Sequence, residues 1–138
     1  MFGKYRHTVD AKGRLFLPSK LREEIGDVFY VMIAPDPCLT IYTEEAWQKV
    51  MDRFNALPIT KSRNLRVLLS NAAKCELDKQ GRFLIPTEMR QYAHLEQDVT
   101  FSGQGERAEI WDTAAFDELE KQKLKPEEVL AAMEELGF

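Results

Sequence analysis

Short apolar runs bounded by turn residues recur along the chain and predict β-strands. The runs VFYVMIA and CLTIY flank Pro35-Asp36-Pro37, and the runs VTFSG and RAEIW flank Gln104-Gly105. Proline and glycine favour tight turns at such places, so each pair of runs predicts two antiparallel strands that are joined locally. One hairpin is therefore expected in each half of the chain.

Apolar residues at helical spacing follow each of these hairpins. Thr43 and Asp112 stand where the N-caps of two helices are expected. The apolar positions after them, whose aromatic side chains we expect in the core, are Trp47, Val50, Met51, Phe54, Phe116 and Leu119.

Two further helices are predicted outside the hairpin units. Pro58 begins a turn between the halves, and the helix that follows carries Lys61, Arg63 and Arg66. A last helix begins at Pro126, because proline is favoured at a first helical position. It places one apolar stripe opposite an acidic side; the stripe consists of Val129, Leu130, Met133 and Leu136.

One motif occurs twice with an offset of 68 residues. DAKGRLFLPSKLR spans residues 10 to 22, and DKQGRFLIPTEMR spans residues 78 to 90. In each copy D-x-x-G predicts a hairpin turn ending in a bulge, because Asp bonds to the backbone two residues on and Gly accepts positive φ. The repeated order of turn, arginine, strand and helix start indicates an internal duplication.

A short helix is expected at the end of each motif copy. Ser19 and Thr87 are its candidate caps. Gly26 is expected to end the first of these helices, whereas His94 occupies the matching place in the second, so the two C-terminal caps are expected to differ.

The duplication divides 138 residues into near halves. A domain of that size buries only about 60% of its unfolded surface, so each half is expected to share a core with the other.

Hydrophobic content of 44% with 30% charged residues is typical of a soluble globular protein. The chain has no signal-peptide pattern and no apolar run near the roughly 20 residues of a membrane span, which favours a cytoplasmic location. Cys38 and Cys75 do not suggest a disulfide framework there.

Charge is distributed unevenly along the chain. The net charge is −4, but residues 1–22 hold six basic side chains against one acidic, and residues 112–138 hold three basic against eight acidic. Such a chain can present a basic face to a polyanion while it stays acidic as a whole. A mixed, solvated surface is an equally open interpretation.

Motifs for catalysis and metal binding are absent from the sequence. There is no G-x-S-x-G, G-x-x-x-x-G-K, H-E-x-x-H or C-x-x-C. A zinc site would require His7, His94, Cys38 and Cys75 to converge from four separate elements. Asp10 and Asp78 are candidates for paired carboxylates in acid-base chemistry, although turn-capping explains both more simply. We therefore expect no catalytic residue, metal, cofactor or small-molecule substrate.

The arginine directly after each glycine turn has two possible roles. Arg14 and Arg82 project from rigid turns, where a guanidinium can reach a phosphate or the O6/N7 edge of guanine. Alternatively, Arg14 pairs with Asp10 and Arg82 with Asp78. Two symmetric arginine-tipped turns favour the first role, because twofold surfaces match repeats in DNA. The expected flanking phosphate contacts are Lys12, Lys79, Arg22 and Arg90.

The motif D-x-x-G-R-x-x-x-P-x-x-x-R followed by a hairpin resembles the AbrB/SpoVT type of swapped-hairpin DNA-binding domain. Two copies in one chain, with the start MFGKYRHTVDAKGRLFLP and the linking ALPIT, resemble the MraZ family. This resemblance implies an α+β, mainly β fold, in which two AbrB/SpoVT-like repeats form an intramolecular swapped-hairpin β-barrel with flanking helices. It also implies a ring-shaped homo-oligomer and a nucleoid-associated transcriptional regulator that binds short repeats upstream of the division and cell-wall gene cluster.

Residue by residue, the resemblance implies DNA contacts at Arg14 and Arg82. It assigns turn-orienting roles to the aspartate and glycine of each motif copy, which are Asp10, Gly13, Asp78 and Gly81. AbrB-like domains also use a basic residue three before the motif aspartate, where this chain has His7 and Cys75. The second copy is only weakly basic, so we expect the first copy to contribute more affinity for DNA.

The sequence therefore predicts a DNA-binding regulator that is not an enzyme. The expected organisation is a first repeat over residues 1–57, a linker helix over 58–72, a second repeat over 73–124 and an amphipathic helix over 125–138. A rival hypothesis is an AbrB-type antitoxin or protein-interaction module that uses the acidic C-terminal tail. An acid-base enzyme on a small barrel is a third, which would require a pocket with convergent polar groups.

Overall fold

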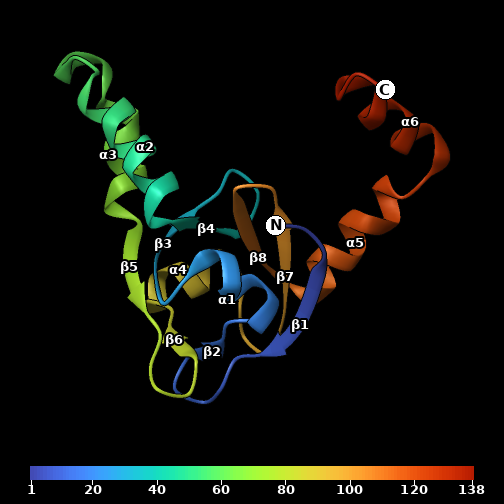
Figure 1. Cartoon of the computed structure of the whole chain (residues 1–138), viewed down its shortest axis with the longest axis horizontal. Coiled ribbons are helices and arrows are strands. Elements are labelled where there is room, and N and C mark those ends of the chain that lie inside the picture. The colour runs from blue at the N-terminus through green and yellow to red at the C-terminus, as the bar shows by residue number, and fades with distance from the viewer.

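The two halves of the chain repeat one order of elements (Figure 1). The computed structural model describes residues 1–138. The first half comprises β1 (Lys4–Thr8), β2 (Arg14–Phe16), α1 (Ser19–Ile25), β3 (Val28–Ile33), β4 (Leu39–Thr43) and α2 (Glu44–Asn55). The second comprises β5 (Ala72–Glu76), β6 (Arg82–Leu84), α4 (Thr87–Tyr92), β7 (Asp98–Gln104), β8 (Arg107–Asp112) and α5 (Thr113–Lys123). A 3₁₀ turn at Ile59–Lys61 and α3 (Arg63–Ser70) join the halves, and α6 (Pro126–Glu135) ends the chain.

The halves are interlocked because each lends strands to the other. One antiparallel sheet has the strand order β1-β7-β8-β4-β3-β5, and β2 and β6 form a separate two-stranded ribbon. Strand β1 pairs with β7 of the second half, and β5 pairs with β3 of the first. The architecture is thus α+β, and it matches the expected swapped arrangement of two tandem repeats.

The two predicted hairpins β3–β4 and β7–β8 are confirmed. The hairpins predicted around the D-x-x-G turns are only half right. The turns themselves form, but the strands on either side of each turn pair with the other repeat instead of with each other. Residue pattern identifies a strand and its buried face, but it does not specify the partner strand.

A pseudo-twofold axis relates the repeats. In the β2–β6 ribbon Leu15 lies opposite Phe83, which is its own counterpart 68 residues along the chain. In the large sheet Thr40 lies opposite Glu109, and each stands three positions before the N-cap of the next helix. The axis therefore runs through both sheets, and the two D-x-x-G turns lie symmetrically about it.

Both repeats contribute to one core of 19 buried residues. Phe83 at the axis contacts Phe29 of the first repeat edge-to-face, with ring centroids 5.0 Å apart. It also lies 6.5 Å from Phe101 of its own repeat. Neither half can bury this cluster alone, as the short length of each half predicts.

Helices α2, α3, α5 and α6 project outward from the two sheets (Figure 1). Helix α2 buries no residue completely, so the expectation that its aromatic residues Trp47 and Phe54 are core is only partly right, because both are half-buried. Trp47 is half-buried and stacks on Tyr30, with ring centroids 4.9 Å apart and an angle of 6° between the planes. Phe116 of α5 is buried against Trp111, as expected.

Two of the four predicted N-caps are confirmed. The side chains of Thr43 and Asp112 each accept a hydrogen bond of 3.0 Å, from the backbone N–H of Ala46 and Ala115 respectively. The predicted caps Ser19 and Thr87 are wrong. Prolines 18 and 86 occupy the N-cap positions, so Ser19 and Thr87 are already helical and their side chains cap nothing.

The C-terminal caps of α1 and α4 differ, as expected. Gly26 follows α1 with φ 83° and ψ −173°, a conformation that is essentially restricted to glycine. After α4 the left-handed residue is His94 at φ 55°, the only non-glycine residue with positive φ. The N–H groups of Leu95 and His94 donate to the carbonyls of Arg90 and Gln91, which forms a Schellman cap.

Candidate functional site

The turn of the first motif copy is held by one carboxylate. The Oδ1 atom of Asp10 accepts from the backbone N–H groups of Lys12 and Arg14, both at 2.9 Å. Its Oδ2 atom accepts from Nε of Arg14 at 2.8 Å. Gly13 closes the turn by donating to the Asp10 carbonyl at 3.0 Å. The aspartate thus orients both the turn and the arginine side chain.

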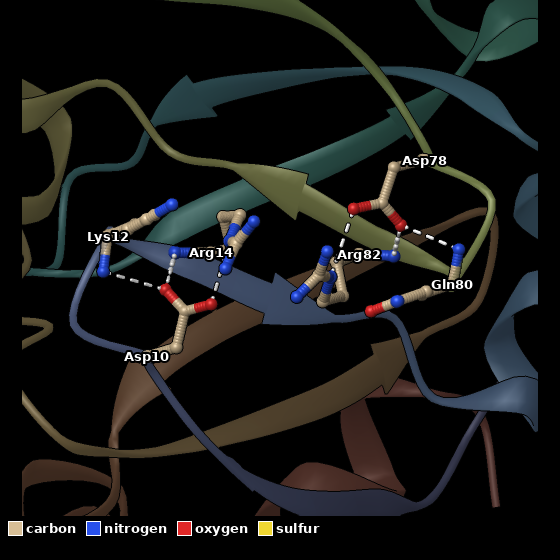
Figure 2. Close-up of polar contacts among 6 residues, drawn as sticks. All are labelled: Asp10, Lys12, Arg14, Asp78, Gln80 and Arg82. Atoms are coloured by element: carbon tan, nitrogen blue, oxygen red, sulfur yellow. Dashed lines mark hydrogen bonds and ion pairs between the residues drawn. The ribbon is translucent and has the colours of Figure 1, made fainter.

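The second copy reproduces this geometry (Figure 2). The Oδ1 atom of Asp78 accepts from the N–H groups of Gln80 and Arg82, both at 2.9 Å, and its Oδ2 atom accepts from Nε of Arg82 at 3.0 Å. Each carboxylate accepts three hydrogen bonds within its own turn, and Asp10 and Asp78 lie at opposite ends of the ribbon with the two arginines between them (Figure 2), an arrangement that does not favour one acid-base pair. These hydrogen bonds favour turn orientation, the simpler of the two roles considered for the aspartates.

These hydrogen bonds lower the pKa of both carboxyls. Backbone N–H groups of Arg14 and of Arg82 are the largest cause for Asp10 and Asp78 respectively, and the side chains of the same arginines add to it. Both aspartates are therefore ionised near neutral pH, and each neutralises part of its arginine's charge.

Each arginine nevertheless keeps the outer end of its guanidinium group free. Only Nε of Arg14 and of Arg82 donates to the aspartate, and their Nη atoms make no hydrogen bond within the protein. Both side chains are partly exposed and rise from one face of the β2–β6 ribbon (Figure 2). The two roles considered for these arginines are therefore compatible, because a side-on ion pair leaves the two-donor end available.

The turn glycines are covered by arginines of the opposite repeat. Gly13 has φ 82°, and a Cβ atom built on it would lie 2.9 Å from Cζ of Arg90. Gly81 also has φ 82°, and its Cβ would lie 3.3 Å from Nη1 of Arg22. Each helical arginine thus lies against the turn of the other copy. The sequence shows that both arginines recur in the motif, but it cannot show this exchange, which depends on the interlocked strands.

The two helical arginines differ in their own partners. Nε of Arg22 donates to Oδ1 of Asp27 at 2.9 Å. Nε of Arg90 is buried without any hydrogen-bond partner. A two-residue connection brings Asp27 close to α1, whereas five residues separate α4 from β7. Arg90 is consequently the less neutralised cation of the pair.

Part of the basic N-terminal charge is neutralised inside the molecule. Lys4 pairs with Glu120 at 2.6 Å and Arg6 pairs with Asp117 at 3.0 Å, and both acids belong to α5. Lys12 and Lys79, by contrast, are exposed and make no ion pair. The lysine side chains of the two turns therefore keep their charge unpaired, whereas Lys4 and Arg6 do not.

The arrangement of side chains gives little support for a metal site or a reactive cysteine. No three His, Cys, Asp or Glu side chains lie together as a metal-binding group. Burial raises the pKa of the Cys38 thiol to about 12 and that of the Cys75 thiol to about 11, so neither is a thiolate near neutral pH. Burial also lowers the pKa of His7. No helix is long and apolar enough to span a bilayer.

The interlocked strands and the paired Asp–Arg turns define a tandem-repeat, swapped-hairpin domain of the AbrB/SpoVT type. The chain belongs to the MraZ family, whose model, described as "MraZ protein, putative antitoxin-like", matches residues 1–67 and 68–135. The family resemblance of the motif is thereby confirmed.

Similar proteins over most or all of the chain carry the name transcriptional regulator MraZ. The one from Caldanaerobacter subterraneus subsp. tengcongensis is 40% identical over 88% of this chain and 87% of its own length. The one from Thermoanaerobacter pseudethanolicus is 39% identical over 100% of this chain and 99% of its own. The one from Halothermothrix orenii is 40% identical over 99% and 98% respectively.

Proposed function

We propose that this protein is a sequence-specific DNA-binding transcriptional regulator that reads short repeats upstream of the division and cell-wall gene cluster. The observation that carries the proposal is the pair of arginines on the β2–β6 ribbon, each held by an aspartate through Nε alone. The names of its relatives support the regulatory role. A location in the cytoplasm on the nucleoid belongs to the same proposal.

The geometry suits base recognition in the major groove. That groove admits a two-stranded β-ribbon, and arginine binds guanine through two parallel hydrogen bonds to O6 and N7. The aspartates restrict Arg14 and Arg82 before binding, which reduces the entropy lost on contact. Gly13 and Gly81 have positive φ and no side chain, which leaves room for Arg90 and Arg22 to lie beside the turns.

Four further cations surround the arginine pair as phosphate contacts. Lys12 and Lys79 extend from the turns, and Arg22 and Arg90 lie across the opposite turns. Phosphate contacts fix the position on the duplex and carry no sequence information. The acidic helices α5 and α6 leave one side of the molecule and point away from β2 and β6, so they do not oppose a polyanion at this face (Figure 1).

The test is binding to the DNA upstream of the protein's own gene, measured by fluorescence anisotropy against a scrambled duplex. Arg14→Ala and Arg82→Ala are each expected to weaken specific binding by about 10- to 100-fold, since a bidentate base contact is worth about 1–3 kcal/mol. The loss at Arg14 is expected to be larger, because residues 10–22 carry four basic side chains against one acidic and residues 78–90 carry three against two.

Controls separate recognition from folding and from general attraction. Circular dichroism must show that both variants keep the fold. Lys123→Ala changes a cation on α5, away from the ribbon, and is expected to bind as wild type does. For each phosphate contact, log affinity should fall by about 0.9 for every tenfold rise in salt concentration. Unchanged binding in both arginine variants, or a flat salt response, would contradict the proposal.

Self-assembly of several copies is part of the proposal. The apolar residues of α6 are exposed, and α2 and α3 leave an apolar hollow lined by Val50, Phe54, Leu57, Leu65, Leu68 and Leu69. Arg53 also lines this hollow, and α3 and the turn before it carry the exposed cations Lys61, Arg63 and Arg66. Because α6 is acidic, α6 of one copy is complementary to α2 and α3 of another. This arrangement uses the tail within the assembly, in place of the antitoxin-like partner considered as a rival.

Light scattering tests the assembly. Leu130→Asp with Met133→Asp places charge on the apolar stripe of α6 and is expected to reduce the particle to the 16.0 kDa monomer. Gln122→Asp on α5 adds one charge off this stripe and should leave the mass unchanged. A monomeric wild type whose α6 is unprotected in hydrogen exchange would instead favour a protein partner for the tail.

A further inference from the structure

Two large apolar side chains stand among the arginines of the β2–β6 ribbon. Strand alternation points Leu15 and Phe83 into the core and places the flanking residues on the outer face. On that face Arg14 lies opposite Leu84, and Phe16 lies opposite Arg82. Phe16 is 46% exposed and Leu84 is 59% exposed. Each arginine thus has one exposed apolar neighbour across the ribbon.

The fold explains only part of this arrangement. Cζ of Arg82 lies 5.9 Å from the centre of the Phe16 ring, so Phe16 helps to place that arginine. Leu84 has no ring with which to hold Arg14 in the same way. Its side chain is mostly in water, and a polar residue would fit the strand there as well. The leucine is therefore unexplained by packing or by arginine orientation.

We propose that Phe16 and Leu84 are specificity-determining residues that contact the C5-methyl groups of thymines next to the bases read by Arg14 and Arg82. This inference rests on the proposed DNA-binding function. In the major groove the thymine methyl is the apolar group that a base pair displays, and apolar side chains recognise it by contact. The ribbon brings such side chains into the groove together with the arginines.

The dimensions of the ribbon fit adjacent base pairs. Residues directly opposite each other in an antiparallel pair lie about 4.5–5.5 Å apart, and neighbours on one face of a strand lie about 7 Å apart. Base pairs of B-DNA are stacked at about 3.4 Å. An apolar side chain beside a guanine-reading arginine therefore lies over a base pair one or two steps away, and the pseudo-twofold arrangement supplies two such positions.

Deoxyuridine provides a direct test, because it lacks only the methyl group of thymidine. Each thymine of the operator repeat is replaced in turn, and affinity is measured by anisotropy for wild type, Leu84→Ala and Phe16→Ala. Wild type is expected to lose about three- to fivefold at one or more thymines of the repeat, the value of one buried methyl group. Each alanine variant is expected to lose this sensitivity at its own thymine while it still prefers the operator to a scrambled duplex.

Phe16→Leu is the matched control, because it keeps an apolar contact but removes the ring beside Arg82. It should retain the penalty for deoxyuridine. Substitution at thymines outside the repeat should change nothing. Equal penalties in wild type and in both alanine variants, or no penalty in wild type, would overturn this inference while specific binding remained. Loss of operator preference in wild type itself would instead overturn the proposed function.

Discussion

The two repeats build the same turn but treat the surrounding residues differently. Asp10 and Asp78 make the same three hydrogen bonds, within 0.2 Å of each other in length. Around these turns, Arg22 has an acidic partner and Arg90 has none. Gly26 ends one helix, while His94 provides the left-handed residue after the other. Turn geometry is therefore the same in both halves, whereas charge and capping are specific to each.

The shared core gives the largest expected effect and tests whether the halves are separable. Phe83→Ala is expected to cost about 3–5 kcal/mol and Leu15→Ala about 2–5 kcal/mol, since both side chains are buried at the axis. Urea unfolding followed by circular dichroism and by tryptophan fluorescence should show one coincident transition for both variants. Two separated transitions would mean that the repeats fold independently.

Substituting alanine for each turn glycine compares the stability of the two turns, because both glycines have the same φ of 82°. Gly13→Ala and Gly81→Ala each force a side chain into φ 82° and are expected to cost about 1–2 kcal/mol. Gly13→Ala should cost slightly more, because its Cβ must displace Arg90, whereas Nη1 of Arg22 moves easily away from Gly81. The measurement is the free energy of unfolding in urea. A neutral result in either copy would show that its turn had relaxed to another conformation.

Substitutions at the C-terminal ends of α1 and α4 are expected to change stability in opposite directions. His94→Gly is expected to stabilise the protein by up to about 1 kcal/mol, because glycine adopts positive φ without strain. Gly26→Ala should destabilise it by about 1–3 kcal/mol, since its φ and ψ are accessible essentially only to glycine. Thermal unfolding monitored by calorimetry compares the two. A destabilised His94→Gly variant would reveal a contact of the imidazole that outweighs the strain.

The smallest expected effects on stability concern the two helical arginines. Arg22→Met removes a largely exposed ion pair with Asp27 and should cost about 0–1 kcal/mol. Arg90→Met removes an unsatisfied buried donor and should be neutral or slightly stabilising. Chemical unfolding provides both values.

In contrast to their effects on stability, Arg22→Met and Arg90→Met should both weaken binding to DNA. Each methionine variant should reduce the slope of log affinity against log salt by about 1, whatever the DNA sequence. Wild-type slopes in both would remove Arg22 and Arg90 from the contact surface. Thr87→Val, which changes an exposed residue of α4 without altering charge, serves as the control for folding.

Residue patterns predicted local structure well, but they did not predict the strand pairing and side-chain contacts between the two repeats. The β3–β4 and β7–β8 hairpins, the caps Thr43 and Asp112 and the two D-x-x-G turns depend on residues close in sequence. The pairing of β1 with β7 and the contact of Arg90 with Gly13 do not, and no local pattern encodes them. The motif predicted which residues form the candidate site, and only the structure shows how each repeat completes the other's turn.

The cross-pairing of β1 also affects how the chain is made. Lys4 lies opposite Ser102, so the first strand has no partner until the ribosome has translated almost one hundred further residues. At about 5–20 residues per second this delay lasts roughly 5 to 20 seconds. During that time the nascent N-terminal half carries an unpaired strand and half of an unfinished core. A chain that stalls or is cut near its middle is therefore expected to be prone to aggregation and to be a substrate for chaperones.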